Sequence, residues 1–161
     1  MATKTARFTY EEHDDESTLS KEEVSLLHAA REAAQHAYAP YSHFRVGAML
    51  LMENGKTVSG TNQENASYPV GICAERTGLS AASSLYPGMP VKAIAVSYDN
   101  ELGESDRPIT PCGICRQTLA EYQQRFGAPI RLILAGRTGK IWVIPDSNAL
   151  LPLSFSGDDL K

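Results

Sequence analysis

CAER (Cys73–Arg76) and PCGIC (Pro111–Cys115) together hold all three cysteines of this 161-residue chain. Thiolates at positions i and i+3 on the first turn of a helix lie on one face and can bind one metal ion. Cys112 and Cys115 have this spacing, and Cys73 on a second helix would add a third ligand. Three thiolates leave one tetrahedral position open, as in catalytic zinc sites. The two stretches therefore predict a metal centre with an open position.

Glu75 follows Cys73 by two residues and starts the same expected helix. From that place its carboxylate can stand over the open metal position without being a ligand. A carboxylate there can take a proton from metal-bound water and pass it on. The alternative is an exposed acidic residue at a helix start, where the helix dipole favours negative charge. We expect the catalytic arrangement, because the metal motif surrounds Glu75.

The composition is that of a globular protein, with 42% hydrophobic and 21% charged residues. No apolar run approaches the ~20 residues of a membrane span, and the N-terminus shows no secretory signal. The odd number of cysteines argues against a disulfide framework and fits a reducing interior. A net charge of −4 disfavours a nucleic-acid partner, which needs a basic surface. We expect a cytoplasmic protein with a small neutral substrate and no membrane partner.

Helices and strands can be placed on both sides of the cysteine stretches. Ser20 and Glu23 form a capping-box pattern before an apolar helical repeat, which should end near Tyr38 because Pro40 follows. Phe44–Met52 has the pattern of a buried strand, and an Asn-Gly turn signal leads into its hairpin partner. We expect helices over 20–38, 73–85, 112–126 and 146–150, and strands over 44–52, 56–61, 91–98, 130–135 and 140–144. This order predicts a three-layer α/β/α sandwich with a mixed sheet of about five strands.

The N-terminal residues 1–18 differ from the rest in being polar and increasingly acidic, with only Phe8 and Tyr10 as apolar anchors. We expect a partly ordered polar leader over 1–18 and a single domain over 19–161. The alternative is a strand or arm that docks on a neighbouring subunit through the two aromatic rings.

The residues around the two stretches, NQENASYPVGICAERTGL and TPCGICRQTLAEY, carry Cys-x-Glu followed by Pro-Cys-x-x-Cys. This pattern is the signature of zinc deaminases that act on nucleobases. From YAPYSHFRVGA to LLPLSF, the chain resembles the small homotetrameric cytidine deaminases of nucleoside salvage. The resemblance implies the same sandwich fold and a zinc-dependent deaminase domain over 19–161.

What the resemblance implies for the reaction is specific. One zinc per subunit would be bound by Cys73, Cys112 and Cys115. A zinc-activated hydroxide, with Glu75 as proton shuttle, would convert cytidine and deoxycytidine to uridine and deoxyuridine plus ammonia in pyrimidine salvage.

The same resemblance implies a set of substrate contacts. Asn62 and Glu64 would hold the sugar hydroxyls, since an amide and a carboxylate can bind a diol; the alternative is a turn or cap role. Phe44 would pack on the pyrimidine; the alternative is that it packs only in the protein core. Ala74 would contact the base through its backbone. Tyr68 and Phe155 would reach into a neighbouring subunit's active site, so that a homotetramer with shared sites is implied.

Two arginines lie beside the expected ligands. Three thiolates on one zinc leave a net negative cluster, and a nearby cation can offset that charge. Arg76 follows Glu75, and Arg116 follows Cys115. In similar cytidine deaminases the arginine after the glutamate has this role. Ordinary surface ion pairs are the alternative for both residues.

Two other functions compete with cytidine deamination. Blasticidin S deaminases share the cysteine core, and the pair Asn62 and Glu64 favours a free nucleoside over such a substrate. A structural zinc module would need a fourth protein ligand, for which His43 is the least implausible histidine.

The charged loop 99–110 ends at the second metal helix, so it could reshape the rim of the pocket or the subunit contact.

Overall fold

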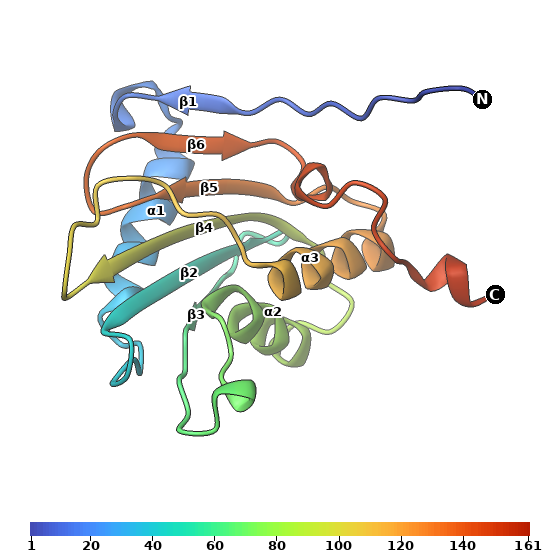
Figure 1. The fold of residues 1–161 in the computed structure, drawn as a ribbon. Coiled ribbons are helices and arrows are strands. Elements are labelled where there is room, and N and C mark those ends of the chain that lie inside the picture. The colour runs from blue at the N-terminus through green and yellow to red at the C-terminus, as the bar shows by residue number, and fades with distance from the viewer.

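A six-stranded mixed sheet, in the order β1-β6-β5-β4-β2-β3, separates two layers of helices in the computed structural model, which describes residues 1–161 (Figure 1). The strands are β1 (Glu11–His13), β2 (Phe44–Met52), β3 (Thr57–Thr61), β4 (Val91–Asn100), β5 (Arg131–Ala135) and β6 (Ile141–Ile144). The helices are α1 (Lys21–Ala34), α2 (Ala74–Leu85) and α3 (Gly113–Phe126). The predicted α/β/α sandwich is confirmed, with six strands where about five were expected.

The middle of the sheet is built on β4, which pairs antiparallel with β2 and parallel with β5. α3 lies in the connection between the two parallel strands, as a crossover helix must. Alternate residues of β4 face opposite layers. Ile94 and Val96 join the apolar core under α2 and α3, whereas Ala93 and Ala95 join the core under α1. Each face of the sheet is thus covered by helix.

α1 begins at the predicted capping box, where the Glu23 amide donates to Ser20 Oγ and the Ser20 amide donates to the Glu23 carboxylate. The helix ends at Ala34 and not near Tyr38 as predicted. Gln35 and the two residues after it form tighter i→i+3 hydrogen bonds. The Tyr38 amide donates to the Asn62 carbonyl at 3.1 Å, which takes this residue out of the helix. A long-range backbone contact therefore ends the helix before Pro40 does.

Residues 11–13, within the leader expected over 1–18, form the sixth strand of the sheet. β1 pairs antiparallel with β6, and its Glu12 accepts hydrogen bonds from Lys140 and from the Trp142 indole. Tyr10 packs against the Trp142 ring with centroids 5.3 Å apart. The strand escaped prediction because Glu11–His13 has no apolar pattern; edge pairing and ion pairs hold it. Phe8 remains exposed.

Both cysteine-bearing helices begin where the sequence indicates. Cys73 is the residue before α2 and Cys112 the residue before α3, each in extended conformation. α3 ends at Gly127, whose φ of 64° is the left-handed conformation that glycine adopts without strain. The predicted short helix near 146 is a 3-10 turn over Ser147–Leu150, capped by the Asp146 side chain. None of the helices combines the length and the apolar character that a membrane span requires.

The position of α2 depends on Gly60 of β3. A methyl group at Gly60 would lie 2.2 Å from the Ala74 carbonyl oxygen and 2.4 Å from the Gly78 nitrogen. Both atoms belong to the backbone, so the helix would have to move. We expect Gly60→Ala to lower the free energy of unfolding by about 3 kcal/mol in urea denaturation. Gly157→Ala is the matched control because its methyl would meet only the Gln124 side chain, at 3.8 Å. Equal stability of the two variants would refute the close packing.

Candidate metal centre and adjoining cavity

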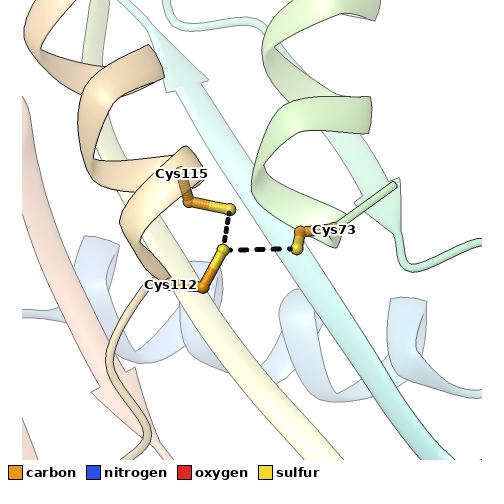
Figure 2. Close-up of side chains that lie close together, drawn as sticks. All are labelled: Cys73, Cys112 and Cys115. Atoms are coloured by element: carbon orange, nitrogen blue, oxygen red, sulfur yellow. Dashed lines mark hydrogen bonds between the residues drawn. The ribbon is translucent and has the colours of Figure 1, made fainter. Parts of the chain in front are cut away.

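The three cysteines converge from two helices onto one point. The Sγ atoms of Cys73, Cys112 and Cys115 all lie within 4.8 Å of one another (Figure 2). Cys73 and Cys112 are 3.7 Å apart, and Cys112 and Cys115 are 3.5 Å apart. No disulfide joins them. Three free thiols so close together from fixed helix starts fit a soft metal ion such as zinc.

The electrostatics of the cluster favour a thiolate at Cys73. The neighbouring Cys115 thiol lowers the pKa of Cys73 to about 6, and Arg76 acts in the same direction. The same interaction raises the pKa of Cys115. Cys73 also stands at the start of α2, where amide groups and the helix dipole favour negative charge. The cluster therefore holds one thiolate readily, and metal binding would release the protons of the others.

Glu75 is buried in the first turn of α2, with 5% of its surface exposed. Burial raises the pKa of its carboxyl group. Its charge acts on Cys73 and Cys115, so the carboxyl lies within electrostatic reach of the cluster. The alternative of an exposed helix-start carboxylate does not describe this residue. A buried acid that keeps its proton more readily than usual can donate as well as accept one.

A cavity of about 420 Å³ opens beside Cys73. Such a volume is in the range of sites for small organic ligands. Of the residues expected to contact substrate, Asn62, Glu64 and Tyr68 line it. The full lining is Tyr41, Ser42, Asn62, Gln63, Glu64, Asn65, Tyr68, Gly71, Ile72 and Cys73. The segment that precedes the first metal helix thus forms the wall of the cavity.

Glu64 and Asn62 are held by backbone groups. Glu64 Oε2 accepts from the amides of Tyr41 at 2.9 Å and Ser42 at 3.2 Å. Burial opposes ionisation, but the hydrogen bonds from Ser42 and Tyr41 outweigh it and lower the pKa of Glu64. Asn62 donates to the Phe44 carbonyl at 2.9 Å and accepts from the Val46 amide at 2.7 Å. Both side chains are fixed in place and keep unused polar capacity.

Phe44 stacks on Tyr98, with centroids 4.8 Å apart and ring planes at 17°. Its side chain is half-buried and does not line the cavity. Ala74 is the first residue of α2, directly after Cys73, and is fully buried. The structure therefore places Phe44 and Ala74 in packing positions, while their roles toward a base stay predictions.

Tyr68 and Phe155 lie in different places. Tyr68 is 75% exposed at the cavity wall and meets the Tyr41 ring edge-on, with centroids 6.0 Å apart. Phe155 is 60% exposed and lines a separate cavity beside α3, where its carbonyl accepts from Gln117. Within one chain the structure does not bring Phe155 into the cavity at Cys73.

The two arginines differ in their surroundings. Arg76 is half-buried and favours the Cys73 thiolate by its charge. Arg116 donates to the carbonyls of Pro111 at 2.8 Å and Leu150 at 3.0 Å, and to the Thr110 hydroxyl. Arg116 therefore braces the approach to α3 against the chain after β6. No acidic partner neutralises it in an ion pair.

Sequence reasoning missed the residues that hold Glu64. Tyr41 and Ser42 do so through backbone N–H groups, which every residue except proline has, so no side-chain pattern marks them. Their position inside the YAPYSHFRVGA segment was the available signal. His43, considered above as a fourth metal ligand, is absent from the cluster and contacts Glu101 instead.

The model of the cytidine and deoxycytidylate deaminase zinc-binding region matches residues 20–126. A cytidine deaminase of Halalkalibacterium halodurans is 43% identical over 136 residues, covering 84% of this chain and 96% of that protein. A crystal structure of cytidine deaminase from Burkholderia pseudomallei superposes with a TM-score of 0.71 at 40% identity, covering 82% of this chain and 98% of that one. A blasticidin-S deaminase of Bacillus cereus is more distant, at 28% identity over 86% of this chain and 95% of that protein. The chain belongs to the cytidine and deoxycytidylate deaminase family.

Proposed function

We propose that this protein is a zinc-dependent cytidine deaminase, which hydrolyses cytidine and deoxycytidine to uridine and deoxyuridine with release of ammonia. The observation that carries the proposal is the cluster of Cys73, Cys112 and Cys115 with buried Glu75 close by, next to a cavity of about 420 Å³ that Cys73 lines. We further propose that this reaction serves pyrimidine salvage.

Three thiolates fit zinc and leave one position of a tetrahedron without a protein ligand. When bound, zinc would act as a Lewis acid that makes water a nucleophile near neutral pH. Arg76 would offset part of the negative charge of the three thiolates. Arg116, through the Pro111 carbonyl, would keep the approach to Cys112 in place.

Glu75 carries the proton chemistry. Its carboxylate takes one proton from the attacking water and delivers it to the ring nitrogen. It then takes the remaining proton from the new hydroxyl group on the ring carbon and gives it to the amine, which leaves as ammonia when the C–N bond breaks. The raised pKa of its carboxyl suits a group that must hold a proton between these steps. Burial excludes bulk water, which would otherwise exchange that proton.

Recognition of the nucleoside falls to the cavity wall. Glu64 would accept hydrogen bonds from the sugar, and Asn62 would offer its second N–H group there. Phe44 and the Ala74 backbone would contact the pyrimidine. Blasticidin S is the second candidate substrate because a blasticidin-S deaminase is among the relatives. The fixed Asn62 and Glu64 pair favours a free nucleoside over it.

A direct ultraviolet assay of cytidine, deoxycytidine, cytosine and blasticidin S tests this function. We expect kcat/KM for the two nucleosides to exceed that for cytosine at least ~100-fold, because cytosine lacks the sugar that remote binding groups use. A zinc chelator should abolish turnover, and added zinc should restore it. Preference for blasticidin S, or turnover that survives complete zinc removal, would refute the proposal.

Assembly and organisation form part of the proposal. A homotetramer with shared sites would give exposed Tyr68 and Phe155 a place in a neighbouring subunit's cavity. We place the deaminase domain at residues 19–161, with 1–18 as an accessory segment that adds one edge strand. Three free thiols suit a cytoplasmic location, where cysteines stay reduced. Full activity of a monomer in sedimentation experiments would contradict the shared sites.

A further inference from the structure

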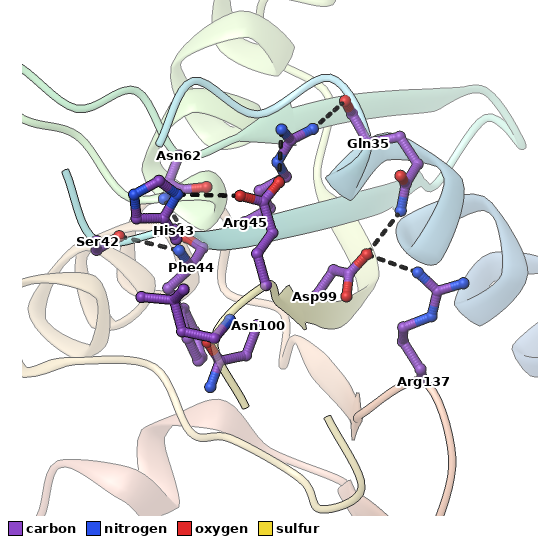
Figure 3. A network of polar contacts seen from close by, with 11 residues as sticks. Gln35, Ser42, His43, Phe44, Arg45, Asn62, Asp99, Asn100 and Arg137 are labelled. Atoms are coloured by element: carbon purple, nitrogen blue, oxygen red, sulfur yellow. Dashed lines mark hydrogen bonds and ion pairs between the residues drawn. The ribbon is translucent and has the colours of Figure 1, made fainter. Parts of the chain in front are cut away.

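The polar network at the start of β2 joins the loop after β4 to the wall of the cavity (Figure 3). Glu101 is the first residue after β4. Its carboxylate binds Arg45 at 2.6 Å and Nδ1 of His43 at 3.1 Å. Its backbone N–H donates to the His43 carbonyl at 3.0 Å. Glu101 therefore contacts both the side chain and the backbone of His43.

His43 has a backbone conformation that is uncommon for a residue other than glycine. Its φ of 56° lies in the left-handed region, which asparagine, aspartate and histidine adopt more often than other non-glycine residues. Residues in such conformations persist where the surroundings over-determine them. The His43 amide donates to the Ala39 carbonyl at 3.0 Å, and Glu101 binds the carbonyl and the ring. The turn that ends at His43 is thus held by Ala39 at its start and by Glu101 at its end.

This turn is also what holds Glu64. Tyr41 and Ser42 directly precede His43, and the backbone N–H of each donates a hydrogen bond to Glu64 Oε2. Both hydrogen bonds go to the same oxygen, so Oε1 is the atom left for a ligand in the cavity. The direction in which Oε1 points therefore depends on the orientation of the two amides. That orientation depends in turn on the backbone conformation of His43.

The chain on either side of Glu101 is anchored to other elements of the fold. Asp99 binds Arg137 at 2.6 Å and Gln35 at 3.3 Å. The Arg137 amide donates to the Ser105 carbonyl at 2.6 Å, which attaches the loop to the turn before β6. The loop after β4 is therefore attached to the sheet at one end, and through Glu101 and His43 it contacts the turn that forms part of the cavity wall.

We propose that Glu101 is a positioning residue for recognition of the sugar, acting through His43 and the Tyr41–Ser42 amides on Glu64. This inference rests on the proposed function, because it assigns Glu64 to the sugar. It also makes the loop after β4 a determinant of substrate affinity, although none of its residues lines the cavity.

Glu101→Ala tests the inference with two substrates. For cytidine we expect KM to rise about fivefold with kcat nearly unchanged, the size of one weakened hydrogen bond. For 2′,3′-dideoxycytidine, which lacks both ring hydroxyls, the same variant should leave kcat/KM unchanged. Glu101→Gln, which can still accept from Arg45, should recover most of the affinity for cytidine. Glu104→Ala is the matched control, since this exposed acid of the same loop makes no ion pair or side-chain hydrogen bond.

Hydrogen–deuterium exchange supplies a readout that does not depend on turnover. In Glu101→Ala, amides 41 and 42 should exchange at least ~10-fold faster than in the parent protein, since their turn loses its support. Amides in α2 should be unaffected. Unchanged exchange at 41 and 42, or an equal loss of kcat/KM for both substrates, would overturn the inference. Failure of the parent protein to deaminate cytidine would instead refute the proposed function and leave the exchange result to decide the coupling.

Discussion

Glu75→Gln should lower kcat for cytidine by about 1,000-fold while zinc stays bound, because general acid–base groups contribute on this scale. Glutamine has nearly the same shape as glutamate and fits the same buried position, so the fold should survive. It cannot accept and return a proton. Since Glu75 lies outside the thiol cluster, the metal content should stay at one zinc per chain.

Steady-state kinetics and metal analysis of the same preparation measure this effect. Glu121→Gln is the matched control, because it makes the same change at an exposed carboxylate of α3. A Glu75→Gln protein that binds zinc and keeps a tenth or more of the parent kcat would show that another group moves the protons.

Cys112→Ser should remove zinc and activity together. Cys112 is the exposed member of the cluster, so its replacement changes ligation with little effect on packing. Changes to groups that merely support metal ligands cost about 10- to 100-fold in metal affinity or activity, so loss of a ligand itself should exceed 100-fold. We expect zinc below ~0.1 per chain after dialysis and no measurable turnover.

Cys73→Ser provides the comparison, since Cys73 enters the cluster from the other helix. If both helices hold the same ion, the two variants should lose zinc to the same extent. Circular dichroism shows whether each remains folded. Retention of one zinc per chain in either variant would mean that the ion is bound elsewhere.

The metal cluster and the main elements could be predicted because local sequence determines them. The spacing of Cys112 and Cys115 defines one face of a helix turn, and Gly127 marks the end of that helix. The capping box at Ser20 likewise fixes the start of α1. In each case the residues that carry the signal are within a few positions of each other.

The features that escaped prediction depend on partners distant in sequence. β1 forms because β6 offers an open edge and Lys140 and Trp142 meet Glu12. α1 stops early because the Tyr38 amide bonds to the Asn62 carbonyl. The amides of Tyr41 and Ser42 bind Glu64 through backbone groups, which no side-chain pattern in the sequence reveals. Phe155 lies beside α3 in a single chain, and an assembled protein is needed to test its predicted role.

X-ray absorption at the zinc edge tests the central claim most directly. The purified protein should contain one zinc per chain, with three sulfur neighbours at about 2.3 Å and one oxygen or nitrogen neighbour at about 2.0 Å. Addition of a product or inhibitor should alter the light-atom neighbour and leave the three sulfurs unchanged. A closed set of four protein ligands, or fewer than three sulfur neighbours, would contradict a catalytic three-cysteine centre.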